Sequence, residues 1–336
     1  MPSPRGSRRR HGKYRRSLNS LTRASERCWP RRRNHSSGSN SPIRDTLRAT
    51  AQDTLAIVSR LLSVLRTEKE ARKAVKFSTT SLTFLDPLPI PLHPRPAIIE
   101  VTKEDTLNAA MRLWVSGDPD DPSQGRPAVL NFANSRKPGG GWLNGAIAQE
   151  EAICYRSSLA LSLHPRLYPL HKDEGLYSRY VLVIREDMTS GHHEIAAEPD
   201  QLPVVSVLTI PALRNPELRT FHYQTSYTVP GEPSTLVSFR NKQIFHYDED
   251  RDITKSKMRL ALRMAAKHGH RKLVLGALGC GVFGNPPEDI AHCWLSVLRE
   301  DEFSGNRWSD VCFAVYDPKN EGNYEIFKQV LAGREV

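Results

Sequence analysis

Two apolar segments of strand length each lead into a glycine-rich loop and then into a helical pattern. The first segment covers 127–133 and precedes three consecutive glycines at 139–141, and the second covers 273–278 and precedes a Gly-x-Gly-x-x-Gly run at 279–284. Glycine costs backbone entropy and adds no packing, so a folded chain keeps such runs where the backbone takes positive φ or closely approaches another group. Because strand-to-helix loops of α/β folds often bind ligands, these two loops predict a ligand site on one sheet.

The rest of the chain continues this alternation of strands and helices. Apolar runs typical of buried strands occur at 98–101, 128–132, 180–184, 204–210, 273–278 and 311–316. Apolar residues at helical spacing occur at 48–65, 105–115, 150–163, 254–268, 287–299 and near 324–331. The order predicts an α/β fold with a mixed, largely parallel sheet covered by helices on both faces. This is a three-layer α/β/α sandwich with an extra N-terminal helix at 48–65.

Two adjacent acids, Glu150 and Glu151, follow the first glycine loop at short range and begin the helical pattern. Carboxylates in the first turn of a helix stabilise its N-terminus, so the pair taken alone indicates only a helix start. The two glycine loops on the same sheet favour a second interpretation, in which the acids belong to a ligand site.

The residues around both loops resemble a known family. The segments are Asn-Phe-Ala-Asn-Ser-Arg-Lys-Pro-Gly-Gly-Gly at 131–141, Gln-Glu-Glu at 149–151 and Gly-Cys-Gly-Val-Phe-Gly-Asn at 279–285. Together they are similar to the bacterial-type (microbial) poly(ADP-ribose) glycohydrolases, a catalytic branch of the macrodomains. The resemblance extends over about 45–332, although 189–201 and 214–246 match no segment of the family. It implies a macrodomain-like sandwich and a glycosidase that cleaves ribose–ribose bonds in poly(ADP-ribose).

The resemblance also implies a role for each part of the site. Glu151 is expected to be the general acid that later activates water, with Glu150 and Asn134 holding the distal ribose. The two glycine loops would surround the diphosphate with backbone amides, and Phe283 would position the ribose. The expected substrate-binding residues are Asn134, Gly139, Gly140, Gly141, Gln149, Gly279, Cys280, Gly281, Val282, Phe283 and Gly284. No metal or other cofactor is implied.

Three functions remain open at this stage. The chain could hydrolyse poly(ADP-ribose), remove single ADP-ribose units from proteins, or bind ADP-ribose without catalysis. The presence of both carboxylates favours catalysis over the non-catalytic reader. The expected partners are therefore poly(ADP-ribose) or ADP-ribosylated proteins, and we expect a monomer.

The net positive charge is confined to the first 44 residues. These carry twelve Arg and one Lys against the single acid Glu26, or +12, whereas the whole chain carries +11. Ser, Pro, Gly and Asn separate the arginines, which predicts a disordered basic tail at 1–44 and one catalytic domain at 45–336. A near-neutral domain behind a basic tail indicates targeting or a nonspecific polyanion contact rather than a nucleic-acid-binding domain.

The tail and the cysteines bear on localisation. We expect an intracellular protein, in the nucleus or cytoplasm, and the arginine-rich, acid-poor tail leaves a mitochondrial presequence open. Five scattered cysteines are typical of reduced thiols in an intracellular protein. The longest apolar stretches are too short to cross a bilayer, so no membrane partner is expected.

Five further residues have simpler interpretations than a reactive site. His268 and His270 fall at the end of a helical pattern, where positive side chains suit the helix C-terminus better than a metal. His192 and His193 lie in a polar stretch and are predicted to be solvated loop residues. Cys280 lies between two glycines with no recognisable base beside it, so we expect a small residue that lets the loop close, not a nucleophile.

Overall fold

The computed structural model describes residues 42–115, 125–228 and 235–336. The basic tail lies outside these ranges except for 42–44, which form the start of the first helix, α1 (Pro42–Leu65). Proline is pre-organised for the first helical position, which explains why α1 begins upstream of the apolar pattern predicted from 48. The other helices are α2 (Glu68–Ala71), α3 (Thr106–Leu113), α4 (Gln149–Arg156), α5 (Asp248–Lys267), α6 (Pro287–Leu298) and α7 (Asn323–Leu331).

Seven strands form one sheet in the order β1-β4-β5-β3-β8-β9-β2. They are β1 (Val75–Ser78), β2 (Ile99–Thr102), β3 (Ala128–Phe132), β4 (Glu174–Leu182), β5 (Val204–Ile210), β8 (Lys272–Leu275) and β9 (Asp310–Ala314). The run from β5 to β2 is parallel, whereas β1 and β4 are antiparallel to their neighbours. The predicted mixed, largely parallel sheet is confirmed.

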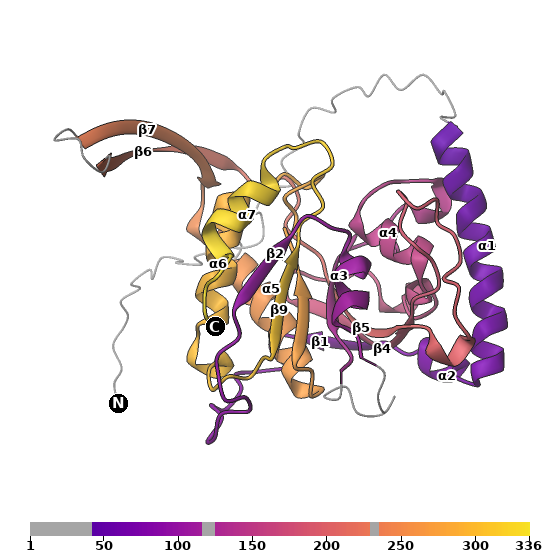
Figure 1. Ribbon diagram of the computed structural model, residues 1–336. Coiled ribbons are helices and arrows are strands. Elements are labelled where there is room, and N and C mark those ends of the chain that lie inside the picture. Colours follow the sequence, from indigo (N-terminus) through magenta and orange to yellow (C-terminus); the bar gives the residue numbers. More distant parts are fainter. Residues whose placement is uncertain (1–41, 116–124, 229–234) are drawn as a thin grey trace, which may run out of the picture. The chain divides into compact units, whose positions relative to one another are not determined.

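Helices cover both faces of this sheet, because successive strand residues point in opposite directions. Leu130 and Leu208 pack in one core with residues of α5, α6 and α7. Their neighbours Val129 and Val207 pack in a second core with residues of α1, α3 and α4. Figure 1 shows the two groups of helices on opposite sides of the strands. The fold is therefore the predicted three-layer α/β/α sandwich.

Four parallel strands, β2, β3, β8 and β9, end at the same edge of the sheet. Thr102 pairs with Ala314, and Leu275 pairs with Phe313, so these strands end level with one another. Each then leads through a loop into a helix, respectively α3, α4, α6 and α7. This edge is where α/β sheets place ligands, and both glycine loops lie on it.

The helix predicted over 150–163 is shorter than expected. Helix α4 ends at Arg156, and a short 3-10 helix follows at Leu159–Leu161. Ser157 has extended backbone and forms an isolated bridge with Val183. Its hydroxyl donates to the carbonyl of Ile153 at 2.7 Å. The apolar spacing continues past this point because the following residues remain buried, although they are no longer helical.

The sequence prediction missed three strands. Strand β1 extends the antiparallel edge of the sheet. Strands β6 (Leu218–Thr228) and β7 (Thr235–Phe245) pair only with each other. Figure 1 shows this hairpin projecting from the sandwich. Polar residues interrupt the apolar ones along this hairpin, so its sequence lacks the apolar runs that mark a core strand.

Among the helices of the described residues, none combines the length and the apolar character that a membrane span requires.

Lys257 is a buried cation in α5 and gives a test of the core. Burial lowers its pKa from 10.5 to about 8, opposed by the charge of Asp173. Between these values the unfolded chain holds the proton and the folded chain does not, so stability rises with pH from about 8 to 10.5.

We expect Lys257→Met to raise the free energy of unfolding at pH 7 by about 1–3 kcal/mol. Urea unfolding at pH 7 and at pH 10 measures this. The gain should shrink at pH 10, where the native lysine is already neutral. A variant that is less stable at both pH values would show that the ammonium group stabilises the fold.

Candidate active site

Glu150 and Glu151 occupy the first turn of α4 and are both buried, at 3% and 8% exposure. Glu150 Oε2 accepts the backbone amide of Asn134 at 2.8 Å. Glu151 Oε1 accepts the backbone amide of Gly141 at 2.8 Å. Each acid is therefore held by one end of the first glycine loop. Carboxylates that only stabilise a helix N-terminus can remain in solvent. The burial of both side chains therefore indicates a role beyond stabilising the start of α4.

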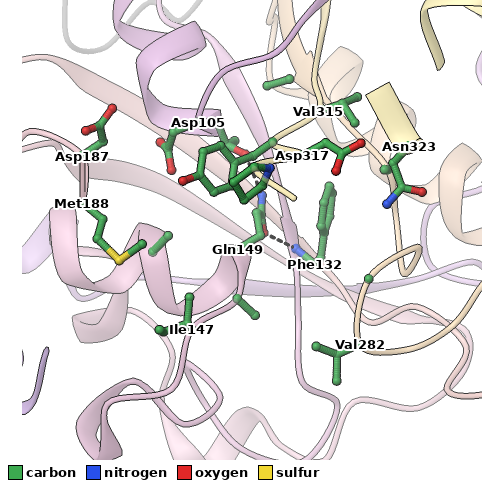
Figure 2. A pocket seen from close by; sticks show the side chains of 18 of the residues that line it. Asp105, Phe132, Ile147, Gln149, Asp187, Met188, Val282, Val315, Asp317 and Asn323 are labelled. Carbon is green, nitrogen blue, oxygen red and sulfur yellow. Dashed lines mark hydrogen bonds between the residues drawn. The ribbon is translucent and has the colours of Figure 1, made fainter. Parts of the chain in front are cut away.

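Gln149 fixes the start of α4 against the end of β3. Its side-chain oxygen accepts the amide of Phe132 at 2.8 Å, and its nitrogen donates to the carbonyl of Leu130 at 2.7 Å and to Thr106 at 3.2 Å. Figure 2 shows the bond to Phe132. Because these contacts occupy the amide, Gln149 orients the two carboxylates that follow it.

The environment of Glu150 favours its protonated form. Burial raises its pKa to about 8, helped by the negative charge of Glu151 and opposed by the amide of Asn134. The side chain of Asn131 approaches the other carboxyl oxygen at 3.5 Å. The raised pKa favours the protonated carboxyl of Glu150 at neutral pH.

The first glycine loop requires glycine because of its backbone and its neighbours. Gly139 and Gly140 have φ of 66° and 61°. A Cβ on Gly140 would lie 2.3 Å from Glu151 Oε1 and 3.1 Å from Glu150 Oε2. The loop thus packs its bare backbone directly on both carboxylates.

In the second glycine loop the conformational demand falls on Gly279 and Gly284, with φ of 76° and 64°. A Cβ on Gly279 would lie 2.4 Å from the side-chain nitrogen of Asn285, which itself donates to the carbonyl of Leu213 at 2.7 Å. A Cβ on Gly281 would meet open space, and its φ is not positive. Substitution at Gly281 therefore intrudes on the space in front of the loop without straining the loop.

A cavity of about 380 Å³ opens at the strand ends beside α4. Figure 2 shows side chains entering it from separate loops: Asp105 before α3, Phe132 at the end of β3, Val282 in the second glycine loop and Val315 after β9. Val282 is 78% exposed, so this wall faces solvent on its outer side. Apolar walls with acidic groups at the margin suit a flat ring that carries polar edges.

The structure divides the predicted residues into two groups. Gln149, Gly279, Gly281, Val282 and Phe283 line the cavity. The remaining predicted residues do not line it, and most of them surround the carboxylate pair or shape the loops: Asn134, Gly139, Gly140, Gly141, Glu150, Glu151, Cys280 and Gly284. Cys280 packs against the core, and burial raises the pKa of its thiol well above the usual range. It lacks the properties of a nucleophile, as the sequence predicted.

Sequence reasoning missed two walls of the cavity. One is the loop from Val315 to Asn323, organised by Asp317, whose carboxylate accepts the amides of Glu321 and Gly322 at 2.7 and 3.0 Å. The loop directly follows a strand that the sequence predicts. Its position at the ligand-binding edge of the sheet could therefore have been inferred from the sequence.

The other missed wall contains His192. Of the two histidines predicted to be solvated, His193 is exposed as predicted, whereas the prediction is wrong for His192. His192 is buried, lies 5.7 Å from the ring of Tyr155 and lines the cavity together with Asp187 and Met188. Burial lowers its pKa, with the charge of Arg156 adding to the effect. No local pattern marks this polar stretch, because its burial comes from packing against α4.

Comparisons with known proteins agree with this geometry. Residues 35–186 match the family described as microbial-type PARG, catalytic domain. The poly(ADP-ribose) glycohydrolase of Thermomonospora curvata is 28% identical, with a TM-score of 0.63 over 85% of this chain and 99% of that one. The structure of the same enzyme bound to the inhibitor ADP-HPD is 29% identical, with a TM-score of 0.61 over 85% of this chain and 99% of that one. The Deinococcus radiodurans poly(ADP-ribose) glycohydrolase in complex with ADP-ribose is 27% identical, with a TM-score of 0.51 over 70% of this chain and 84% of that one. No curated protein matches the chain in sequence.

Proposed function

We propose that this chain, which is similar to the microbial-type poly(ADP-ribose) glycohydrolases over 35–186 and in its fold, hydrolyses ribose–ribose O-glycosidic bonds in poly(ADP-ribose) and releases ADP-ribose. The observation that carries this proposal is the buried pair Glu150 and Glu151, held by the first glycine loop beside the cavity. Glycosidic cleavage needs a proton for the leaving oxygen and a base for the attacking water, and a carboxyl pair that holds a proton can supply both.

In the proposed reaction, Glu151 is the general acid and base. Its Oε1 accepts the Gly141 amide, and its Oε2 makes no hydrogen bond within the described residues, so Oε2 is free to face substrate. The bond from the anomeric carbon to the leaving oxygen breaks as that oxygen takes a proton from Glu151. Water then adds to the anomeric carbon and returns a proton to Glu151. Glu150, neutral at pH 7, would donate a hydrogen bond to a hydroxyl of the distal ribose beside Asn134.

The remainder of the ADP-ribose unit is assigned to the cavity and its rim. Backbone amides of the second glycine loop around Gly281 would bind the diphosphate, and Phe283 would contact the ribose. The adenine would lie between the apolar walls that include Ile147, Met188 and Val282. The cavity volume of about 380 Å³ falls within the range of small-molecule sites.

Defined substrates distinguish this function from its alternatives. Purified protein is incubated with poly(ADP-ribose) and, separately, with a protein that carries single ADP-ribose units, and released ADP-ribose is quantified by chromatography. We expect release from the polymer. Release from the single-unit substrate alone would identify a mono-ADP-ribosyl hydrolase. Calorimetric binding of ADP-ribose without release from either substrate would identify a reader.

The raised pKa of Glu150 predicts the pH dependence of turnover. Because the protonated form of Glu150 is required and its pKa is about 8, kcat/KM should fall as pH rises through about 8. Initial rates on poly(ADP-ribose) between pH 6 and 10 measure this, with far-UV circular dichroism at each pH to establish that the protein stays folded. A kcat/KM that stays constant up to pH 10 in folded protein would contradict the assignment.

A further inference from the structure

A second hollow, of about 680 Å³, borders the first glycine loop and shares no lining residue with the cavity in Figure 2. Two segments form it, one on each side: 135–138 in the loop after β3 and 165–172 before β4. The amide of Leu170 donates to the carbonyl of Ser135 at 2.8 Å and joins the two segments. We call this space the second hollow.

The carboxylate pair lies between the cavity and the second hollow. On one side, Gln149 and Ala152, which flank the pair in α4, line the cavity. On the other side, the amide that binds Glu150 belongs to Asn134, the residue directly before the second hollow begins. Tyr168 lines the second hollow, and burial together with the negative charge of Glu150 raises the pKa of its hydroxyl. Tyr168 is therefore within electrostatic reach of the pair.

The lining of the second hollow suits an anionic ligand with free hydroxyls. Arg136, His171 and Lys172 line it, and none of them forms an ion pair within the described ranges. No acidic side chain lines it; the neighbouring Glu174 is already paired with Lys76 at 3.0 Å.

The hydroxyl oxygen of Tyr168 is buried and has no hydrogen-bond partner in the described residues. Buried hydroxyls are nearly always paired, so this unpaired one, which protein atoms cover beside the second hollow, is a polar group left to be satisfied.

We propose that the second hollow binds the ADP-ribose unit on the leaving side of the scissile bond. Arg136 and Lys172 contact its diphosphate, and Tyr168 hydrogen-bonds one of its ribose hydroxyls. The proposal rests on the proposed function, which assigns the other ADP-ribose unit to the cavity. A polymer that crosses the carboxylate pair must continue beyond it, and the second hollow is the basic space that borders the pair there. Every polymer unit carries a diphosphate, which matches the unpaired cations.

The test compares two substrates that differ only in the leaving group. One is poly(ADP-ribose), and the other is an α-O-phenyl glycoside of ADP-ribose, whose uncharged leaving group cannot reach the cations. We expect the double variant Arg136→Gln, Lys172→Gln to lower kcat/KM for the polymer about tenfold. The value for the phenyl glycoside and the affinity for free ADP-ribose should stay unchanged. Arg95→Gln, Lys267→Gln is the matched control, because both residues are exposed and line neither space.

Tyr168→Phe supplies an independent arm. Because its hydroxyl has no hydrogen-bond partner among the described residues, its removal should leave the melting temperature unchanged or higher, while kcat/KM for the polymer falls severalfold. Equal losses on both substrates, or no loss with the polymer, would overturn the second-hollow assignment. Wild-type protein that hydrolyses neither substrate would instead overturn the proposed function, so the two failures are distinguishable.

Discussion

Replacement of Glu151 by glutamine is expected to lower the hydrolysis of poly(ADP-ribose) by about 100-fold or more, while ADP-ribose still binds. Glutamine retains an oxygen that can accept the amide of Gly141, so the first glycine loop keeps its anchor. It cannot protonate the leaving oxygen or accept a proton from water. Glutamine has nearly the same shape as glutamate, and Glu151 does not line the cavity, so the cavity walls that bind ADP-ribose are unchanged. Steady-state kinetics and calorimetric titration with ADP-ribose measure the two effects separately.

Glu325→Gln is the matched control for this variant. Glu325 also lies in the first turn of a helix, α7, but it is exposed and lines neither the cavity nor the second hollow. If Glu151 acts only through the helix dipole, both variants should lose about 0.3–1 kcal/mol of unfolding free energy and keep normal turnover. Near-normal turnover in Glu151→Gln would show that another group is the general acid.

A valine at Gly281 is expected to weaken ADP-ribose binding by about 1–3 kcal/mol without lowering the melting temperature. Its Cβ meets no atom within 4 Å, so the fold accommodates the side chain. The same side chain occupies the space in front of backbone amides that we assign to the diphosphate. Calorimetric titration and a thermal melt of the same preparation give both quantities.

Gly279→Val serves as the contrasting variant in the same loop. It places a side chain 2.4 Å from Asn285 in a residue with φ of 76°, so it should destabilise the fold itself. Loss of stability at Gly279 and loss of affinity at Gly281 would separate the structural glycine from the binding one. Undiminished affinity in a folded Gly281→Val protein would limit the ligand site to the first glycine loop and the cavity beside it.

The central strands and the two glycine loops could be predicted from the sequence because their signals are local. Strands β3 and β5 have the predicted bounds, since a buried parallel strand is a continuous apolar run. The end of α4 could not be predicted in this way. Ser157 leaves the helix to pair with Val183, a residue distant in sequence, and helical spacing carries no information on such a contact.

In the candidate site, too, local features could be predicted from the sequence, whereas features that depend on distant contacts could not. Both loops and the acidic pair were identified from residues close in sequence, but their detailed geometry was not. The sequence did not distinguish the glycines of the second loop from one another, whereas positive φ occurs at Gly279 and Gly284 and not at Gly281. It also gave no indication that the pKa of Glu150 is raised to about 8, because that follows from burial and from the neighbouring charge.

The release of free ADP-ribose from purified poly(ADP-ribose) tests the central claim most directly. Wild-type protein and Glu151→Gln are compared at pH 7, with product quantified over time and ADP-ribose affinity measured on the same samples. We predict that the wild type releases ADP-ribose steadily and that the rate for the variant is lower by about 100-fold or more. The two proteins should have equal affinities for ADP-ribose. Polymer that stays intact with the wild type, while ADP-ribose binds tightly to both proteins, would contradict the claim that the buried carboxylate pair catalyses hydrolysis.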